Sequence, residues 1–450
     1  MKGYLTAVSL IMWLCVAVGI QAQEIKSGPL KVGASKVDVT PAQNELPQQY
    51  KGVLDKIYAR AIVLDNGTTS AALITLDAGA VPTELWQKVS QRLERELGIP
   101  ATNVLITATH SHSVPFKMAP GYADLVFNSA KMAKDKLQPA RMSYGTGLSY
   151  INVQRDMIDE EKRTWWEGAN YGGLSDKTVA VIKFETLTGE PIAVYYNYAV
   201  HAVITGTLDL ISGDIPGASS RYIEDSFDNK VVALWSEGAS GDQNPIYFQQ
   251  TYDLREIRIK DFASRGQDIS NAMPPGGQGL DRENPTVAKL MNQQKQMILS
   301  MGQLLGEEVM HVMRTAHPKT SEVRMYAKQT IASCPGRVRT NQGRGGIAGT
   351  YTEGKPVEIR LGLLMIGDVA IGSVDAEVYN EIAQRLKRES PYAKTMMATL
   401  TNGMASSGYI PDDASYGHYT FEVLSSKLQP GCAEKAIVKG IVDMMPPIAY

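Results

Sequence analysis

The stretch 103–113, Asn-Val-Leu-Ile-Thr-Ala-Thr-His-Ser-His-Ser, joins an apolar run to a polar segment that carries two histidines. Its first half has the branched apolar residues that are typical of a buried strand. Residues two apart on an extended backbone point to the same side, so we expect His110 and His112 to face one site. A strand end that carries imidazoles suits a metal ion, because the rigid strand sets the direction of the ligands.

A second apolar run, 192–200, ends directly at His201. Taken singly, His201 is more typical of a hydrogen-bonded core histidine than of a ligand. The chain has six histidines in all, and His311, His317 and His418 lie outside any comparable context. Three of the six histidines therefore fall in two suggestive places, the pair at 110 and 112 and the strand end at His201.

Similar runs recur along the chain and predict a mixed α/β fold. Strand-like runs cover 31–39, 57–64, 71–76, 103–108, 178–184, 192–200, 230–235, 323–331, 357–366, 369–374 and 395–400. Helical periodicity covers 82–97 and about 285–315, and Asp375 is expected to cap a further helix. Strands and helices do not alternate regularly, and we expect long loops at 255–284 and 334–356.

The first 22 residues have the layout of a secretory signal, with Lys2 before an apolar run and a cleavage end at Ile20-Gln21-Ala22. Without this segment, 428 residues remain, with 44 basic and 47 acidic side chains and a formal charge of −3. This balance, without any basic run, argues against nucleic acid as a partner. No later apolar run approaches the length of a transmembrane helix. We expect an exported protein, periplasmic or secreted, without a transmembrane segment in the mature chain.

The mature chain is expected to form one large domain over about 28–450, because no linker or internal repeat divides it. It retains two cysteines, Cys334 and Cys432, which are too few for a cysteine-rich metal cluster. An exported protein can form disulfides, but the wide separation of these two thiols leaves their pairing open.

Several segments together resemble the neutral ceramidases. Ala-Thr-His-Ser-His-Ser at 108–113 resembles their Ala-Thr-His-Thr-His-Ser, and Asn197 to His201 is similar to their Asn-x-x-Ala-Val-His. Further matches are Asn152-Val153-Gln154-Arg155 with Asn-x-x-Arg, Gly241-Asp242-Gln243-Asn244-Pro245 with part of Gly-Asp-x-Ser-Pro-Asn, Asp375-Ala376-Glu377 with Pro-Gly-Glu, and Tyr409 with the tyrosine of Thr-x-Tyr. The segments occur in the family's order and cover most of the mature chain.

The resemblance implies a zinc ion held by His110, His201, Glu377 and Tyr409. Zinc accepts imidazole and carboxylate ligands, and a catalytic zinc keeps one position for water. A phenol is a less usual ligand that Zn²⁺ can still bind. His112 would line the site as a proton-transfer or substrate-orienting group.

The resemblance further suggests that Arg155 holds a polar or anionic part of the substrate. The family's catalytic serine corresponds here to Asn244, which cannot be acylated. Zinc-bound water is then the expected nucleophile, with Asn244 as a hydrogen-bond donor to the developing oxyanion. Asp242 is expected to orient the water, although its segment is equally good turn chemistry. The family's additional C-terminal β domain is expected to be absent.

These features predict a zinc-dependent hydrolase that cleaves an amide bond in a small or lipid-like substrate, as an N-acyl amidohydrolase does. An ester, a lactone or a glycan-derived substrate is the alternative, and the pair Trp165-Trp166 could line a glycan cleft, although packing is its more ordinary role. A non-catalytic binding protein of the same fold is the third interpretation. Retention of all four presumed ligands and of His112 speaks against it, because a binding module has no need of an open metal site.

Overall fold

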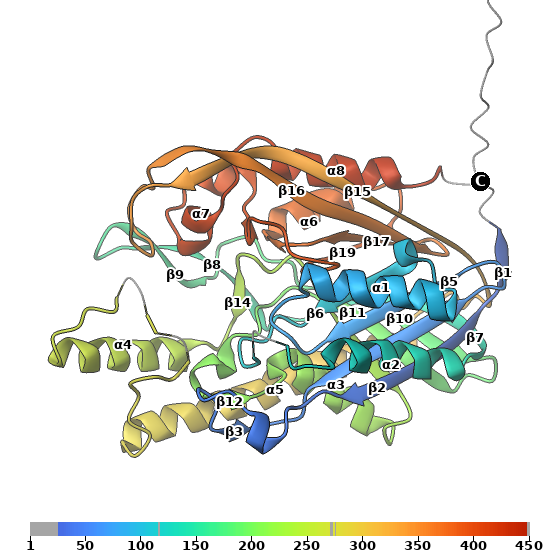
Figure 1. Cartoon of the computed structure of the whole chain (residues 1–450), viewed down its shortest axis with the longest axis horizontal. Coiled ribbons are helices and arrows are strands. Elements are labelled where there is room, and N and C mark those ends of the chain that lie inside the picture. Colours follow the sequence, from blue (N-terminus) through green and yellow to red (C-terminus); the bar gives the residue numbers. More distant parts are fainter. Residues whose placement is uncertain (1–25, 116–117, 271–272, 275, 448–450) are drawn as a thin grey trace, which may run out of the picture.

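Two β-sheets packed face to face form the centre of the protein (Figure 1). The computed structural model describes residues 26–447 apart from 116–117, 271–272 and 275, so the expected signal segment lies outside the described residues. The larger sheet has the strand order β13 (Val232–Glu237), β11 (Pro191–Tyr198), β10 (Thr178–Thr186), β7 (Gln138–Leu148), β2 (Lys31–Asp38), β4 (Tyr58–Asp65), β5 (Ser70–Leu76) and β6 (Val104–Ala108). The smaller sheet has the order β1 (Ser27–Pro29), β15 (Glu322–Arg339), β16 (Tyr351–Ile366), β17 (Val369–Val374) and β19 (Lys394–Ala398).

Helices cover the outer faces of the two sheets. The described α-helices are α1 (Thr83–Leu97), α2 (Tyr122–Asp135), α3 (Asp214–Ser226), α4 (Gln249–Ser264), α5 (Pro285–Thr315), α6 (Asn380–Glu389), α7 (Phe421–Ser425) and α8 (Ala433–Met444), and of these α4 packs on α5 rather than on a sheet. Apolar side chains of α1, α2, α3 and α5 pack on the larger sheet, and those of α6 and α8 pack on the smaller one. The result is a four-layer arrangement, with α6 and α8 along one side of Figure 1 and α2, α3 and α5 along the other.

The period-two pattern of the strands builds these layers. On β4, Ile62 and Leu64 face the space between the sheets, whereas Ala61 and Val63 face the helices. The inner core is shared by both sheets, since it includes Ile366 and other residues of the smaller sheet. Successive side chains of a strand point to opposite faces, so strands that are apolar on both faces end up covered on both sides. The predicted fold class, mixed sheets with interspersed helices in one large domain, is confirmed.

Shorter strands extend this frame around the ends of the sheets. They form three small sheets: β14 (Gln243–Pro245) with β8 (Asn152–Asp159) and β9 (Thr164–Asn170), β12 (Leu210–Ile211) with β3 (Gly52–Val53), and β18 (Glu377–Val378) with β20 (Tyr409–Ile410). Four short 3₁₀ turns complete the described elements, at Gln43–Glu45, Ala101–Asn103, Ile204–Thr207 and Asp413–Gly417.

The segment 399–402, directly after β19, joins the two edge strands of the larger sheet. The amide of Thr399 donates to the carbonyl of Glu237 at the end of β13, at 2.8 Å. The amide of Ala108 at the end of β6 donates to the carbonyl of Leu400, at 3.2 Å. The carboxyl ends of β6, β13 and β19 therefore meet at one place, although they belong to different sheets and distant parts of the chain.

Two expected loops and one expected cap are corrected by the structure. Residues 255–264 belong to α4, and β15 and β16 reach into 334–356 to leave 340–350 as the connection. The strands of this hairpin extend beyond the main core, where their sequence is polar and glycine-rich, so periodicity gave no strand signal there. Asp375 does not cap a helix, because α6 begins at Asn380 and Asp375 instead accepts a hydrogen bond from the amide of Arg360, at 2.9 Å.

Cys334 on β15 and Cys432 before α8 form a disulfide across 98 residues of sequence. It ties the smaller sheet to its outer helix. Closing a loop of about this length removes entropy from the unfolded chain, which is worth about 4–5 kcal/mol in the loop-closure model. Within the described ranges, no helix combines the length and the apolar character that crossing a bilayer requires.

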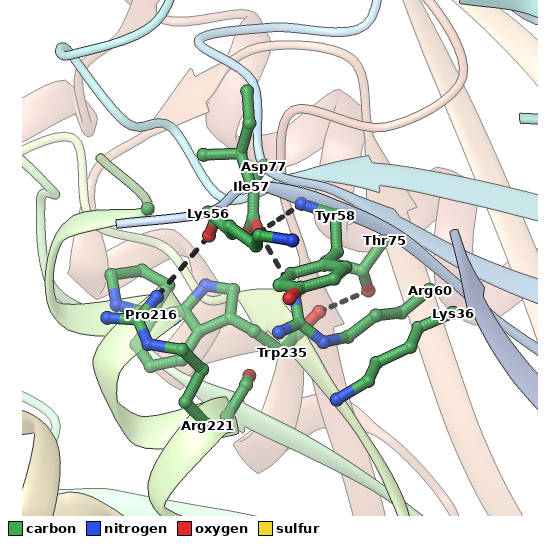
Figure 2. Close-up of polar contacts among 12 residues, drawn as sticks. Lys36, Lys56, Ile57, Tyr58, Arg60, Thr75, Asp77, Pro216, Arg221 and Trp235 are labelled. Carbon is green, nitrogen blue, oxygen red and sulfur yellow. Dashed lines mark hydrogen bonds and ion pairs between the residues drawn. The ribbon is translucent and has the colours of Figure 1, made fainter. Parts of the chain in front are cut away.

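A buried ion cluster lies where β4 meets α3, and Figure 2 shows its members Arg60, Asp77 and Lys36. Arg60 is 1% exposed, and its guanidinium donates to Glu224 at 2.9 Å and to Asp77 at 3.0 Å. Lys36 donates to the other oxygen of Glu224 at 2.7 Å. Figure 2 shows the ring of Tyr58 over the Arg60 guanidinium, which lies 4.8 Å from the ring centre. Asp77 is thereby held at the end of β5, at the start of a loop that reaches the site described next.

Candidate metal centre

His110 and His201 each follow the end of a strand of the larger sheet. His110 comes two residues after β6 and His201 three residues after β11, and both are buried, at 7% and 0% exposure. His112 is exposed, and its Nε2 lies 3.3 Å from Nε2 of His110. One ring nitrogen from each of the three lies within 4.8 Å of the others, as the sequence predicted.

The imidazole rings of His110 and His112 lie close together for a different reason than the one expected from the sequence. His110 has a φ of 58°, so the backbone has left the extended conformation by this point. A left-handed conformation is uncommon for a residue other than glycine and usually needs support from its surroundings. The two imidazoles thus converge through a tight turn after β6, a detail that side-chain alternation along a strand does not predict.

Backbone carbonyls hold the two buried imidazoles in one tautomer. Nδ1 of His110 lies 2.7 Å from the carbonyl of Gly79, and Nδ1 of His201 lies 2.7 Å from the carbonyl of Ser240. A carbonyl can only accept, so Nδ1 carries the proton in both rings. Nε2 of each neutral ring then presents a lone pair to the centre of the cluster, the arrangement found in metal-binding histidines.

Glu377 completes the convergence, from the short strand β18. Its Oε2 lies 3.0 Å from Nε2 of His110 and 3.1 Å from Nε2 of His201. Burial alone would raise the pKa of Glu377, but His110 and His201 hold it well below its usual value. The carboxylate is therefore ionised, and three acceptor atoms face one another.

A single proton can provide a hydrogen-bond donor for only some of these three acceptor atoms. Burial opposes a charge on His110, yet Glu377 raises the pKa of His110, so a proton there would satisfy one contact. Burial, aided by Arg155, lowers the pKa of His201 to about 4, which leaves its Nε2 and Glu377 as two facing acceptors. A cation bound by imidazole and carboxylate would satisfy all of them, and zinc prefers this donor set. The residues present therefore fit a zinc ion.

Tyr409 lies next to Glu377, because β18 and β20 are paired in parallel with these two residues in register. Its ring is stacked beside His201, with the ring centres 6.5 Å apart. The Arg155 guanidinium lies 5.6 Å from the Tyr409 ring centre. The structure thus brings all four residues of the expected ligand set to one place, and the assignment of each as a ligand stays a prediction.

Arg155 is buried, and its charge already has protein partners. Its guanidinium lies 2.9 Å from the carboxylate of Glu422 and donates to the carbonyl of Gly241 at 2.6 Å. It also donates to Oδ1 of Asn244, at 3.2 Å. Arg155 is therefore placed to orient Asn244 and Tyr409. Binding an anionic part of the substrate, the role that the family resemblance suggests, would require the Arg155 guanidinium to contact the substrate in addition to these protein partners.

Asn244 and Asp242 lie on either side of Gln243 but face different surroundings. The Asn244 amide donates to Glu167 at 3.1 Å and to the hydroxyl of Tyr252 at 3.3 Å. Asp242 accepts from the amide of Asn380 at the start of α6, at 2.9 Å, and burial raises the pKa of Asp242 to about 7. Asp242 thus supports α6 structurally, and its role in orienting water stays a prediction.

Three carboxylates around the cluster, two of them buried and that of Glu167 half-buried, were not singled out from the sequence. Glu422 pairs with Arg155, Glu167 accepts from Asn244, and Glu237 accepts from the indole of Trp235 at 2.9 Å. Burial raises the pKa of Glu237 to about 8. A glutamate at the end of an apolar run, as in Leu234-Trp235-Ser236-Glu237, was the one available signal. The other two become notable only through their partners.

Residues 31–363 match the model of the family described as neutral/alkaline non-lysosomal ceramidase, N-terminal. The chain belongs to this family. The matched range includes His110, Arg155, His201 and Asn244, and it ends before Glu377 and Tyr409. The last two residues are therefore placed at the site by the geometry of this chain.

Individual ceramidases are distant relatives of this family member. The neutral ceramidase of Pseudomonas aeruginosa is 27% identical over 277 residues, which are 52% of this chain and 41% of the relative. Neutral ceramidase B of Dictyostelium discoideum is 28% identical over 253 residues, 48% of this chain and 35% of the relative. The chain thus spans about two fifths of the length of the curated relatives it matches.

Solved ceramidase structures share the fold described above. The crystal structure of the Pseudomonas aeruginosa neutral ceramidase gives a TM-score of 0.68 at 18% identity, over 92% of this chain and 74% of that one. A ceramidase complexed with C2 gives 0.70 at 17% identity, with the same coverage. At these identities the likeness concerns the fold, and the chemistry must be argued from the residues.

Proposed function

We propose that this protein is a zinc-dependent hydrolase that cleaves an amide bond in a lipid-like N-acyl substrate. The observation that carries the proposal is the convergence of Nε2 of His110, Nε2 of His201 and a carboxylate oxygen of Glu377 at 3.0–3.1 Å. His110, His201, Glu377 and Tyr409 would hold the metal. Bound there, zinc would supply a Lewis acid that polarises the substrate carbonyl and makes water a better nucleophile near neutral pH.

The protein's own groups would serve the reaction around that centre. We assign the proton transfer to His112, which would take a proton from the attacking water and pass one to the leaving amine; its exposure and its 3.3 Å distance from His110 support this role. Arg155 would position Tyr409 and Asn244. Direct attack by water is favoured because Asn244, at the position of the family serine, has no side chain that can be acylated.

The family membership favours an amide over the alternatives. An ester or lactone would need the same polarised carbonyl and remains the second candidate. The glycan alternative has less support, because the Trp165 ring is stacked on His418 at 4.0 Å between ring centres and is thus used for packing. The disulfide agrees with export to an oxidising compartment, periplasmic or extracellular, which we include in the proposal.

A substrate panel on metal-stripped and zinc-restored protein tests this function. The panel contains an N-dodecanoyl amide, the matched dodecanoyl ester, a lactone and a nitrophenyl glycoside, each followed by product release. We expect amide cleavage that falls at least about 100-fold after chelation and returns with zinc. Cleavage of the glycoside alone, or amide turnover that chelation leaves unchanged, would contradict the proposal.

Asn244→Ala is expected to lower turnover on the amide by about two to three orders of magnitude and to leave zinc content intact. The reason is that the Asn244 amide either donates to the developing oxyanion or, through its contacts to Arg155 and Glu167, sets the donors that do. Steady-state kinetics and metal analysis on the same preparation provide the check. Near-normal turnover with a lowered melting temperature would instead identify Asn244 as a residue that only stabilises its turn.

A further inference from the structure

A small pocket opens beside the metal centre, between β9, α4, the connection 340–350 and the start of α7. Its aromatic walls are Trp166 and Phe421, its charged residues are Glu167, Arg255 and Arg344, and Gly345 and Thr420 complete it. Phe421 is 38% exposed, so the pocket communicates with solvent. Each arginine lies over an aromatic ring, Arg255 at 5.0 Å from the Trp166 centre and Arg344 at 4.8 Å from that of Phe421.

The pocket is connected to the metal centre by direct contacts. The carboxylate of Glu167 accepts a hydrogen bond from Asn244, which is in turn bound by Arg155. On the other side, the ring of Phe421 packs edge-on against Tyr409, with 5.9 Å between the ring centres. Side chains that line the pocket therefore contact Asn244 and Tyr409 directly.

Among the described residues that line the pocket, Arg255 and Arg344 are basic and Glu167 is acidic. The single carboxylate of Glu167 lies 3.7 Å from Arg255 and 3.5 Å from Arg344, which is longer than a direct charged hydrogen bond. Burial alone would raise the pKa of Glu167. The positive charges of Arg155, Arg344 and Arg255 instead hold this pKa at about 2. The carboxylate is therefore ionised, and one negative charge faces two guanidiniums that line the pocket.

Arg255 retains unused hydrogen-bonding capacity. Its side chain is 13% exposed, and its Nη2 is buried without a hydrogen-bond partner among the residues that the structure describes. Burial and the neighbouring Arg344 both lower the pKa of Arg255, which means that its charge is incompletely compensated. A buried donor that lacks a partner costs free energy until an acceptor is bound.

We propose that this pocket binds an anionic group of the substrate, so that the protein hydrolyses N-acyl amides that carry a carboxylate, sulfonate or phosphate near the scissile bond. This inference rests on the proposed amide hydrolysis and specifies its substrate class. The guanidinium fork suits oxyanions, which accept two parallel hydrogen bonds. A neutral lipid amide would leave Arg255 without an acceptor.

Binding of matched probes tests the proposal on the full-length, zinc-loaded protein. The first pair is the ketone isostere of N-dodecanoylglycine, with CH₂ in place of the amide NH so that no cleavage occurs, and its neutral carboxamide counterpart. A second pair carries the carboxylate or carboxamide on the acyl side instead. The dissociation constants are measured by calorimetry. In one of the two pairs, we expect the anion to bind at least about tenfold more tightly than its neutral partner. The pair that shows this preference identifies the side of the scissile bond on which the anionic group lies.

Arg255→Gln and Arg344→Gln are the informative variants. Each is expected to reduce the preference for the anion by about tenfold or more while leaving the affinity for the neutral probe nearly unchanged. Arg265→Gln, at the exposed end of α4, is the matched control and should alter neither. Equal affinity for anion and neutral probe in the wild type, or a preference that survives both variants, would overturn the subsite.

The two proposals fail in different ways. Strong, Arg255-dependent binding of the anionic isostere, with no cleavage of the corresponding amide, would refute amide hydrolysis and leave the anion site standing. Cleavage of neutral and anionic amides at equal kcat/KM would refute the anion site and leave the hydrolase standing.

Discussion

Replacing His201 by alanine is expected to remove most of the bound zinc and with it nearly all turnover. His201 is fully buried, and its lone pair at Nε2 faces Glu377 at 3.1 Å. Loss of a group that merely supports a metal ligand costs about 10–100-fold in metal affinity, so loss of a ligand itself should cost more than about 100-fold. Zinc per chain, measured by elemental analysis after dialysis, and amide turnover in the same samples are the two readouts.

A matched control separates metal loss from general damage. His311→Ala removes an exposed histidine from α5 and should keep both zinc and activity. The far-ultraviolet circular dichroism of His201→Ala should remain close to that of the wild type, because the sheet ends before the histidine. Full zinc occupancy in a folded His201→Ala protein would rule out the proposed ligand set.

Replacing Arg60 by methionine is expected to lower the free energy of unfolding by about 3–5 kcal/mol. The substitution keeps most of the side-chain volume but removes the cation that pairs with both Asp77 and Glu224, and Lys36 remains as a partner of Glu224 alone. Unpaired buried charges are costly because the interior solvates them poorly. Urea unfolding followed by circular dichroism measures the change.

Lys131→Met provides the comparison for Arg60→Met. Lys131 pairs with Asp135 on the surface of α2, and exposed pairs contribute about 0–1 kcal/mol. Equal losses in the free energy of unfolding for the two substitutions would show that the buried cluster stabilises the protein no more than a surface ion pair does. Because Asp77 begins the loop that carries the Gly79 carbonyl bound by His110, we also expect Arg60→Met to weaken zinc binding.

The strands of the fold were predicted well wherever a run of apolar side chains indicates that the segment is buried. The apolar runs at 57–64, 71–76 and 369–374 became strands of the two sheets almost residue for residue. The prediction failed at 255–264, 334–339 and 351–356, which belong to α4, β15 and β16. There the elements extend away from the core, so their stability comes from local hydrogen bonds and neighbouring segments, which hydrophobic periodicity does not record.

The candidate site was predictable in part. His110, His112 and His201 follow apolar strands, and that context was visible in the sequence. Glu377 and Tyr409 had no comparable signal in their own neighbourhoods and were suggested only by resemblance to a family. In the structure they face the histidines because β18 and β20 pair in parallel beside the segment that closes the larger sheet.

The amino-acid sequence by itself determined which strands are buried and which residue types stand at their ends, because burial and side-chain period are local properties of the chain. It also determined that position 244 has no nucleophile. Only the tertiary structure decided that His110 and His201 share one tautomer and that the charge of Arg155 is paired with Glu422. The same holds for Arg255 and Arg344, which lie far apart in sequence yet face the single carboxylate of Glu167. These relations depend on distances between atoms from separate segments, and the folded chain establishes them by packing the two sheets against each other.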